Sequence, residues 1–157
     1  MILTRILFGL VLLGAFPLAA NSQIARHGLQ VGNIKDKSLA DGCGCDFRLR
    51  GTSVRSERFI FVSSIEENDQ SAWMNIDGKD TELKLVKSTE SKRRERVGMR
   101  FSETYAAGNL TVRIDLVVTR VCRPDDENCE STDYKATFTV KRSGEKRIIG
   151  AVGSCGC

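Results

Sequence analysis

The sequence predicts an all-β protein, an antiparallel barrel or sandwich of about eight strands stapled by disulfides. From residue 41 onward apolar and polar residues alternate with a period of two, and turn-forming residues recur at regular intervals. The chain also has six cysteines among 157 residues, a length that suits one domain only just large enough to bury a core without covalent help. We therefore expect a single antiparallel β domain from residue 41 to residue 157.

The first twenty residues predict a cleaved secretory signal peptide. Arg5 gives the start a positive charge, residues 6–20 are uncharged and largely apolar, and the segment ends on the small residues Ala19 and Ala20. This uncharged run is shorter than the ~20 residues that a membrane-spanning helix needs, and no second such run follows. We expect cleavage after Ala20 or two residues later, and a periplasmic or secreted protein without a membrane anchor.

Residues 21–40 predict a loose N-terminal arm, because they show little periodicity and few bulky side chains. The arm contains His27, the only histidine of the chain. With one histidine the sequence offers no Ser-His-Asp or Cys-His arrangement, and nucleotide-binding glycine motifs are absent. The net charge of +4 is too small to indicate a nucleic-acid partner. We therefore expect a non-enzymatic protein without a cofactor.

Three hairpins can be placed by their turns and by the alternation of the flanking residues. Asp77-Gly78 predicts a two-residue turn that pairs Ile76 with Lys79, because both turn positions tolerate positive φ. One face of this hairpin is then apolar and the other polar. The expected inward residues are Ala72, Met74, Ile76, Leu83 and Leu85, and the expected outward residues are Trp73, Asn75, Asp80, Glu82 and Lys84.

The other two hairpins follow from the same reasoning. Residues 106–109 predict the second turn and Ser143-Gly144 the third. For the second hairpin the expected pairs are Tyr105 with Leu110, Phe101 with Ile114, Met99 with Leu116, Val97 with Val118 and, on the outer face, Arg100 with Asp115. For the third they are Phe138 with Ile149 and Ala136 with Ala151, with the inner face continuing to Cys155 and Cys157. Further strands are expected at residues 43–49 and 58–63.

Two identical tripeptides, Cys43-Gly44-Cys45 and Cys155-Gly156-Cys157, lie at opposite ends of the domain. If the first and last strands run antiparallel side by side, glycine permits a close approach and the cysteines face each other in pairs. The expected disulfides are Cys43–Cys157, Cys45–Cys155 and Cys122–Cys129. Closing a loop of around 110 residues stabilises a protein by ~4–5 kcal/mol in the chain-entropy model.

The same tripeptides allow a metal site formed by Cys43, Cys45, Cys155 and Cys157, because four thiolates bind zinc or Cu(I). Secretion favours oxidation to disulfides, and the C-x-C spacing is tighter than that of the usual zinc knuckle. A four-cysteine metal-binding protein is therefore the alternative function.

Binding is the function class that remains. Trp73, the only tryptophan, falls on the polar face beside Glu82 and Lys84, and an exposed aromatic side chain can anchor a partner. We predict that this patch binds an extracytoplasmic protein or another ligand. The competing interpretation is that the N-terminal arm or another loop covers Trp73.

Residues 77–83, which begin Asp77-Gly78, and residues 102–111 resemble the central hairpins of the periplasmic C-type lysozyme inhibitors. This resemblance implies a small, eight-stranded, disulfide-bearing barrel and gives lysozyme inhibition as a further alternative function. The family places an S-G-x-x-Y motif in the lysozyme cleft, which makes Ser102 the candidate contact. In this chain the local sequence is Ser102-Glu103-Thr104-Tyr105, without the glycine and with a shorter spacing.

Overall fold

The computed structural model describes residues 28–53, 55–64, 71–90, 95–123, 126 and 129–157. Within these ranges one antiparallel sheet of nine strands contains all of the regular structure except a short 3-10 helix. The elements are β1 (Val31–Gly32), η1 (Lys37–Ala40), β2 (Gly44–Leu49), β3 (Phe59–Ser64), β4 (Ser71–Ile76), β5 (Lys79–Ser88), β6 (Arg100–Ala107), β7 (Leu110–Arg120), β8 (Ser131–Arg142) and β9 (Glu145–Gly156). The predicted signal peptide and His27 lie outside the described residues.

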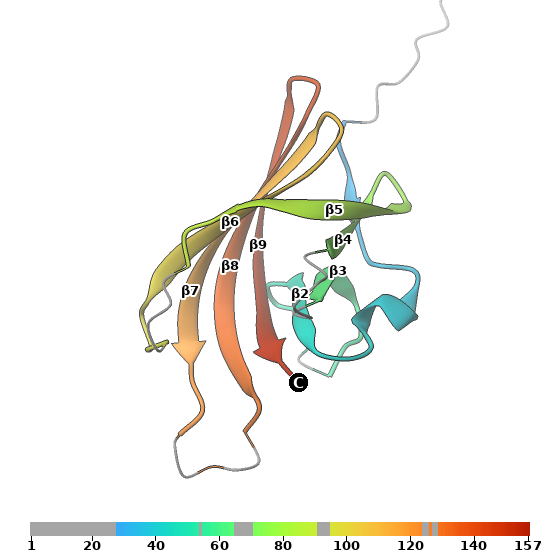
Figure 1. The fold of residues 1–157 in the computed structure, drawn as a ribbon. Coiled ribbons are helices and arrows are strands. Elements are labelled where there is room, and N and C mark those ends of the chain that lie inside the picture. Colours follow the sequence, from blue (N-terminus) through green and yellow to red (C-terminus); the bar gives the residue numbers. More distant parts are fainter. Residues whose placement is uncertain (1–27, 54, 65–70, 91–94, 124–125, 127–128) are drawn as a thin grey trace, which may run out of the picture.

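Strands β2 to β9 form a closed up-and-down barrel, in which each strand pairs with the next one along the chain. The last strand, β9, returns to pair with β2, and this pairing closes the barrel. In Figure 1 the long strands β7, β8 and β9 form one side and β2, β3 and β4 the other. The predicted all-β, eight-stranded, disulfide-stapled fold is confirmed as a barrel, with β1 as one extra strand paired to β4. None of the helices among the described residues is long and apolar enough to cross a membrane.

The first and third hairpins have the predicted register. Ile76 pairs with Lys79 across the Asp77-Gly78 turn, and Phe138 pairs with Ile149 below the Ser143-Gly144 turn. The inward residues of both hairpins alternate with outward ones and supply much of the core. Fully buried aromatic rings at its centre come from three different strands: Phe47, Phe61 and Phe138.

The second hairpin is shifted by two residues from the predicted register. Ala107 pairs with Leu110, so the turn is only Gly108-Asn109, and Gly108 adopts the positive φ of 56° that a two-residue hairpin turn needs. The predicted pair of Arg100 with Asp115 is therefore wrong. Because the shift is even, the side chains within β6 and β7 keep their predicted faces, whereas Val97 lies outside β6 and is exposed.

Residues 28–40 pack against the barrel, which corrects the prediction of a loose arm for this part of residues 21–40. Leu29 and Ile34 are buried, and β1 pairs with the end of β4. Three backbone N–H groups of the segment donate to two carboxylates of the first hairpin: Gln30 to Asp77 at 2.8 Å, and Lys35 and Asp36 to Asp80 at 2.8 and 2.9 Å. The blue segment beside β4 in Figure 1 is this part of the chain.

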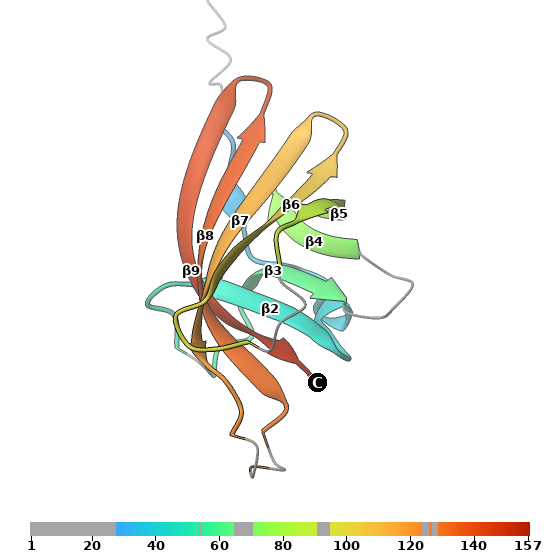
Figure 2. The same ribbon diagram turned by 60° about the vertical axis from the view of Figure 1, so that its left-hand side comes forward.

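The pairing of β2 with β9, which we call the seam, carries two disulfides. Cys43 is bonded to Cys157 and Cys45 to Cys155, while Cys122 and Cys129 are bonded across the β7–β8 connection. All three predicted pairs are confirmed: the strand register predicts the two at the seam, and Cys122–Cys129 is the remaining pair. In Figure 2 β2 and β9 lie side by side close to the C-terminus.

The glycines of the two tripeptides are required by close backbone contact. A Cβ atom on Gly44 would lie 2.0 Å from the carbonyl oxygen of Ser63, and one on Gly156 would lie 2.1 Å from that of Glu130. Because these neighbours are backbone atoms, they cannot rotate away as a side chain would. The Cys-Gly-Cys pattern thus brings both disulfides and a close strand approach to one place.

Candidate functional site

The strand register places a row of side chains across the outer wall of the barrel beside the seam. Each member lies directly opposite the next on the neighbouring strand. In the order β9, β2, β3, β4 and β5 the row is Ser154, Asp46, Val62, Trp73 and Glu82. Two members, Trp73 and Glu82, are residues that the sequence selects as a binding patch.

A groove of about 520 Å³ follows this row from Ser154 to Trp73, and we call it the outer groove. Residues 38–42 border it, so the turn of η1 forms one of its walls. Its floor beside the seam is a second cross-strand row made of small residues: Ser131, Gly156, Gly44 and Ser64. The lack of large side chains there leaves the space that the groove occupies.

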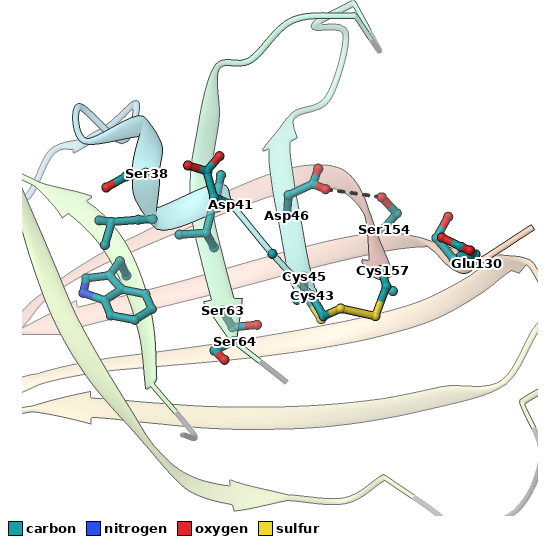
Figure 3. Close-up of a pocket in the computed structure, with 18 residues that line it drawn as sticks. Ser38, Asp41, Cys43, Cys45, Asp46, Ser63, Ser64, Glu130, Ser154 and Cys157 are labelled. Carbon is teal, nitrogen blue, oxygen red and sulfur yellow. Dashed lines mark hydrogen bonds between the residues drawn. A yellow bond between two sulfur atoms is a disulfide. The ribbon is translucent and has the colours of Figure 1, made fainter. Parts of the chain in front are cut away.

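Three carboxylates line the outer groove: Asp41, Asp46 and Glu130. In the view of Figure 3, Asp46 lies between Asp41 and Glu130, with the Cys43–Cys157 disulfide beside them. No Lys, Arg or His is found among the described residues that line the groove. The groove is therefore locally acidic in a chain whose net charge is positive.

The three carboxylates differ in their surroundings. Asp46 is half-buried, forms an ion pair with Arg48 at 2.7 Å and accepts a long hydrogen bond of 3.4 Å from the Ser154 hydroxyl. Asp41 and Glu130 are exposed, and neither forms an ion pair with a described Lys or Arg. Asp41 and Glu130 are thus available to a cationic partner, whereas Asp46 is already partly neutralised.

The predicted residues Trp73, Glu82 and Lys84 lie together on β4 and β5. Trp73 is half-buried and lines the outer groove with Ser38, Leu39 and Ala40, so the N-terminal segment borders the indole without enclosing it. Glu82 and Lys84 form an ion pair at 2.6 Å, and both also hydrogen-bond the buried Ser71 hydroxyl. This ion pair lies at the Trp73 end of the row.

Ser102 does not join this group. It lies on β6, where its N–H donates to the Thr89 hydroxyl at 2.8 Å and its carbonyl accepts the Thr89 N–H at 2.9 Å. The residue of β6 that faces Lys84 is Ala106. Ser102 is four residues further along the strand, a distance of about 13 Å. The structure therefore separates Ser102 from Trp73 and the outer groove.

The sequence pattern gives no sign of Asp41 as a site residue, and it marks Glu130 only as a member of the acidic run at residues 125–133, which could steer a charged partner. Both lie outside the strands, and they reach the groove only because η1 and the β7–β8 connection are positioned beside the seam. Asp46 was identifiable as an outward residue next to Cys45, since polar and apolar residues alternate along β2. A groove wall made from irregular segments needs the tertiary structure to be seen.

All six cysteines are in disulfides, including the four of the alternative metal site. A disulfide sulfur is not a thiolate ligand, so this alternative requires the seam to be reduced. Elsewhere in the described part of the chain no group of three or more His, Cys, Asp or Glu side chains is placed to hold a metal ion.

The chain matches no protein-family model, no curated protein and no solved structure. The interpretation of the site therefore rests on its geometry and chemistry.

Proposed function

We propose that this protein is a non-enzymatic extracytoplasmic binding protein whose outer groove recognises a basic segment of a partner protein. One observation carries the proposal: Trp73 and three carboxylates line a single groove in which no described residue is basic. The disulfides support an oxidising compartment, where such bonds form and persist.

The chemistry of the groove matches lysine or arginine side chains. Carboxylates form charge-assisted hydrogen bonds with both, and an indole face attracts a cation while also packing against the aliphatic part of its side chain. Asp41 and Glu130 lie at separate positions along the groove, so a segment with two spaced cations suits it better than a single ion. Complementary charge of this kind favours fast and selective association.

The surroundings of the groove support recognition by a preformed surface. Two disulfides hold β2 to β9, while Gly44 brings β2 into close contact with Ser63 of β3 and Gly156 brings β9 into close contact with Glu130 and Ser131. A surface that is already ordered loses less conformational entropy when it binds. Hydrolytic chemistry has little support, since the serines that line the groove have no described histidine beside them to act as a base.

Lysozyme inhibition is the second candidate, favoured by the closed eight-stranded, disulfide-bearing barrel that the sequence resemblance implies. The separation of Ser102 from the outer groove means that the two candidates use different surfaces. Inhibition of a C-type lysozyme that is lost in Ser102→Ala and kept in Asp41→Asn would favour this second candidate.

The emission of Trp73 tests the proposal, because this residue is the only tryptophan of the chain and lines the groove. The oxidised full chain is titrated with a short Lys/Arg-rich peptide and, separately, with a Glu/Asp-rich peptide of the same length. We expect the basic peptide alone to change the emission, with an affinity that falls as salt is added. The double variant Asp41→Asn/Glu130→Gln should weaken the basic peptide about tenfold or more.

Asp115→Asn is the matched control, since Asp115 is a half-exposed, ion-paired carboxylate on β7 and does not line the groove. It should bind the basic peptide as the wild type does. Equal responses to the two peptides, or equal losses in Asp115→Asn and in the double variant, would overturn the proposal.

A further inference from the structure

A second cavity, of about 190 Å³, lies inside the barrel at the end that carries the seam, and we call it the inner cavity. The Cys45–Cys155 disulfide forms part of its wall, with Ser63 and Ser64 of β3 beside it. Five aromatic rings and two leucines supply most of the remaining lining: Phe47, Phe61, Phe101, Tyr105, Tyr134, Leu85 and Leu116. The inner cavity also contains Glu90 and Glu103.

Glu103 points into the barrel at a position where the alternation of β6 calls for an apolar residue. Its inward neighbours on the same strand are Phe101 and Tyr105, and all three line the inner cavity. The Tyr105 hydroxyl donates to the Glu103 carboxylate at 2.9 Å, and no other described residue hydrogen-bonds or ion-pairs with that carboxylate. A carboxylate among aromatic rings is costly to bury unless a charge partner is supplied.

Two further acidic residues lie in or near the inner cavity. Glu90 lines the inner cavity, and Glu95 accepts a hydrogen bond of 2.5 Å from the Tyr134 hydroxyl. Burial raises the pKa of Glu103, and the charge of Glu90 raises it further. Burial likewise raises the pKa of Glu90, with an added contribution from Glu95. No Lys, Arg or His is found among the described residues that line the inner cavity.

The lining discriminates between classes of ligand. An anion would be repelled by Glu90 and Glu103, and a neutral apolar molecule would leave the Glu103 charge without a cationic partner. A metal ion would need more oxygen ligands, and the described residues form no group suited to one. An organic ammonium ion satisfies both parts of the lining, because aromatic faces and carboxylates each attract it.

We propose that the inner cavity binds a small organic ammonium ion, with its cationic head against Glu103 and Glu90 and its apolar groups among the aromatic rings. An engineered cavity of ~150 Å³ accepts benzene, so the inner cavity has room for a ligand of about six to ten non-hydrogen atoms. The proposal goes beyond the outer groove: the ligand is a small molecule and its site lies inside the barrel.

Calorimetric titration with choline and with dimethylbutanol, its uncharged carbon isostere, tests the proposal. The two molecules have the same shape and differ in charge, so their ratio of affinities reports the electrostatic and cation–π contributions. We expect the oxidised full chain to bind choline about tenfold or more tightly than dimethylbutanol. Glu103→Gln should remove most of this difference, since the amide keeps the shape and the acceptor for Tyr105 but carries no charge.

Two further variants complete the experiment. Phe101→Leu should weaken choline while keeping an apolar wall, because only the aromatic face attracts the cation. Asp115→Asn, on the outer surface of β7, should leave choline binding unchanged. Thermal unfolding of each variant shows whether it is folded at the temperature of the titration.

Equal affinity for choline and dimethylbutanol would overturn the proposal, as would undiminished choline binding by Glu103→Gln. Absence of binding to choline at about 10 mM would overturn it as well. These results leave the outer groove proposal intact, because the peptide titration uses different residues and a different readout.

Discussion

The outer groove and the inner cavity lie on opposite faces of the same strands, and both are acidic, yet their acidic groups act in different ways. Asp41 and Glu130 of the outer groove are exposed, whereas Glu103 of the inner cavity is half-buried among aromatic rings. Exposed charges attract partners over a distance but are screened by salt. A half-buried charge acts only on contact and pays a desolvation cost that raises its pKa.

The difference follows from the alternation of side chains along each strand. Asp46 and Val62 line the outer groove alone, while their neighbours Cys45 and Ser63 border the inner cavity and also reach the edge of the outer groove. Small residues beside the seam keep the outside open, and large rings leave a small space inside. The same strands, joined by the seam disulfides, can therefore present two surfaces of different selectivity, one outside and one inside the barrel.

The largest expected effect on stability comes from removing both seam disulfides. Replacing Cys43, Cys45, Cys155 and Cys157 by alanine should lower the free energy of unfolding by ~4–5 kcal/mol in the chain-entropy model. Removing only one of the two seam disulfides should cost much less, because the other closes a loop of nearly the same length, 110 or 114 residues in sequence separation. Denaturant unfolding under oxidising conditions measures these differences.

The Cys122–Cys129 disulfide provides the comparison, since it closes a short loop with a sequence separation of 7. Its removal should cost about 2–3 kcal/mol in the same model, about half of the ~4–5 kcal/mol expected from opening the long loop. Equal and additive losses for the two seam disulfides would contradict this account of the seam.

A smaller effect is expected from one methyl group at the seam. Gly44→Ala should destabilise the protein by about 1–3 kcal/mol or more, because the new Cβ would overlap the Ser63 carbonyl oxygen at 2.0 Å. Gly150→Ala on β9 is the matched control, since a Cβ there meets only the Arg50 side chain at ordinary distances from 3.6 Å. That variant should be neutral or slightly stabilising in thermal unfolding. Similar losses of stability in both variants would show that replacing any glycine in a strand destabilises the protein, and that the close contact at Gly44 is not the cause.

The smallest expected effect is a pH dependence of the melting temperature, which should have opposite signs for the half-buried Glu103 and the exposed Asp77. Burial raises the pKa of Glu103, so its ionised form destabilises the fold above that pKa, and this destabilisation disappears below the ordinary value of 4.5. Glu103→Gln should therefore raise the melting temperature at neutral pH, with the gain vanishing as the pH falls to that value. A gain that persists at acidic pH would show that the charge is not its cause.

Asp77→Asn should show the opposite sign. The N–H of Gln30 and the guanidinium of Arg142 lower the pKa of Asp77, so its charge stabilises the fold above the ordinary value of 3.8. The variant should melt below the wild type at neutral pH and approach it as acid protonates Asp77. Asparagine tolerates the positive φ of 50° at this turn position, so the backbone is not strained.

Much of the fold could be predicted because its signals are local or repeated. Asp77-Gly78 and Ser143-Gly144 set two registers directly, and the paired Cys-Gly-Cys tripeptides identify the strands that close the barrel. The second register failed because Ala106 and Ala107 fit either a turn or a strand. Residues 28–40 gave no pattern, since β1 has only two residues and the rest is held by side chains of the first hairpin.

The candidate sites were less predictable for a physical reason. Trp73 and Glu82 follow from strand alternation, but the outer groove also needs η1 and the β7–β8 connection, which have no periodicity. Glu103 did carry a signal: it shares the inward face with Phe101 and Tyr105 and breaks its apolar pattern. A polar residue at a core position is the kind of local conflict that marks a functional site.

The most direct test of two independent sites uses backbone amide NMR spectra of one isotope-labelled sample. The sample is titrated with choline and, separately, with the basic peptide. We predict that choline shifts the amides of inward positions around Glu103, Phe101 and Tyr134. The peptide should instead shift those around Asp41, Trp73 and Glu130, and each ligand should bind equally well in the presence of the other. A single shared set of shifted residues, or competition between the two ligands, would contradict this prediction.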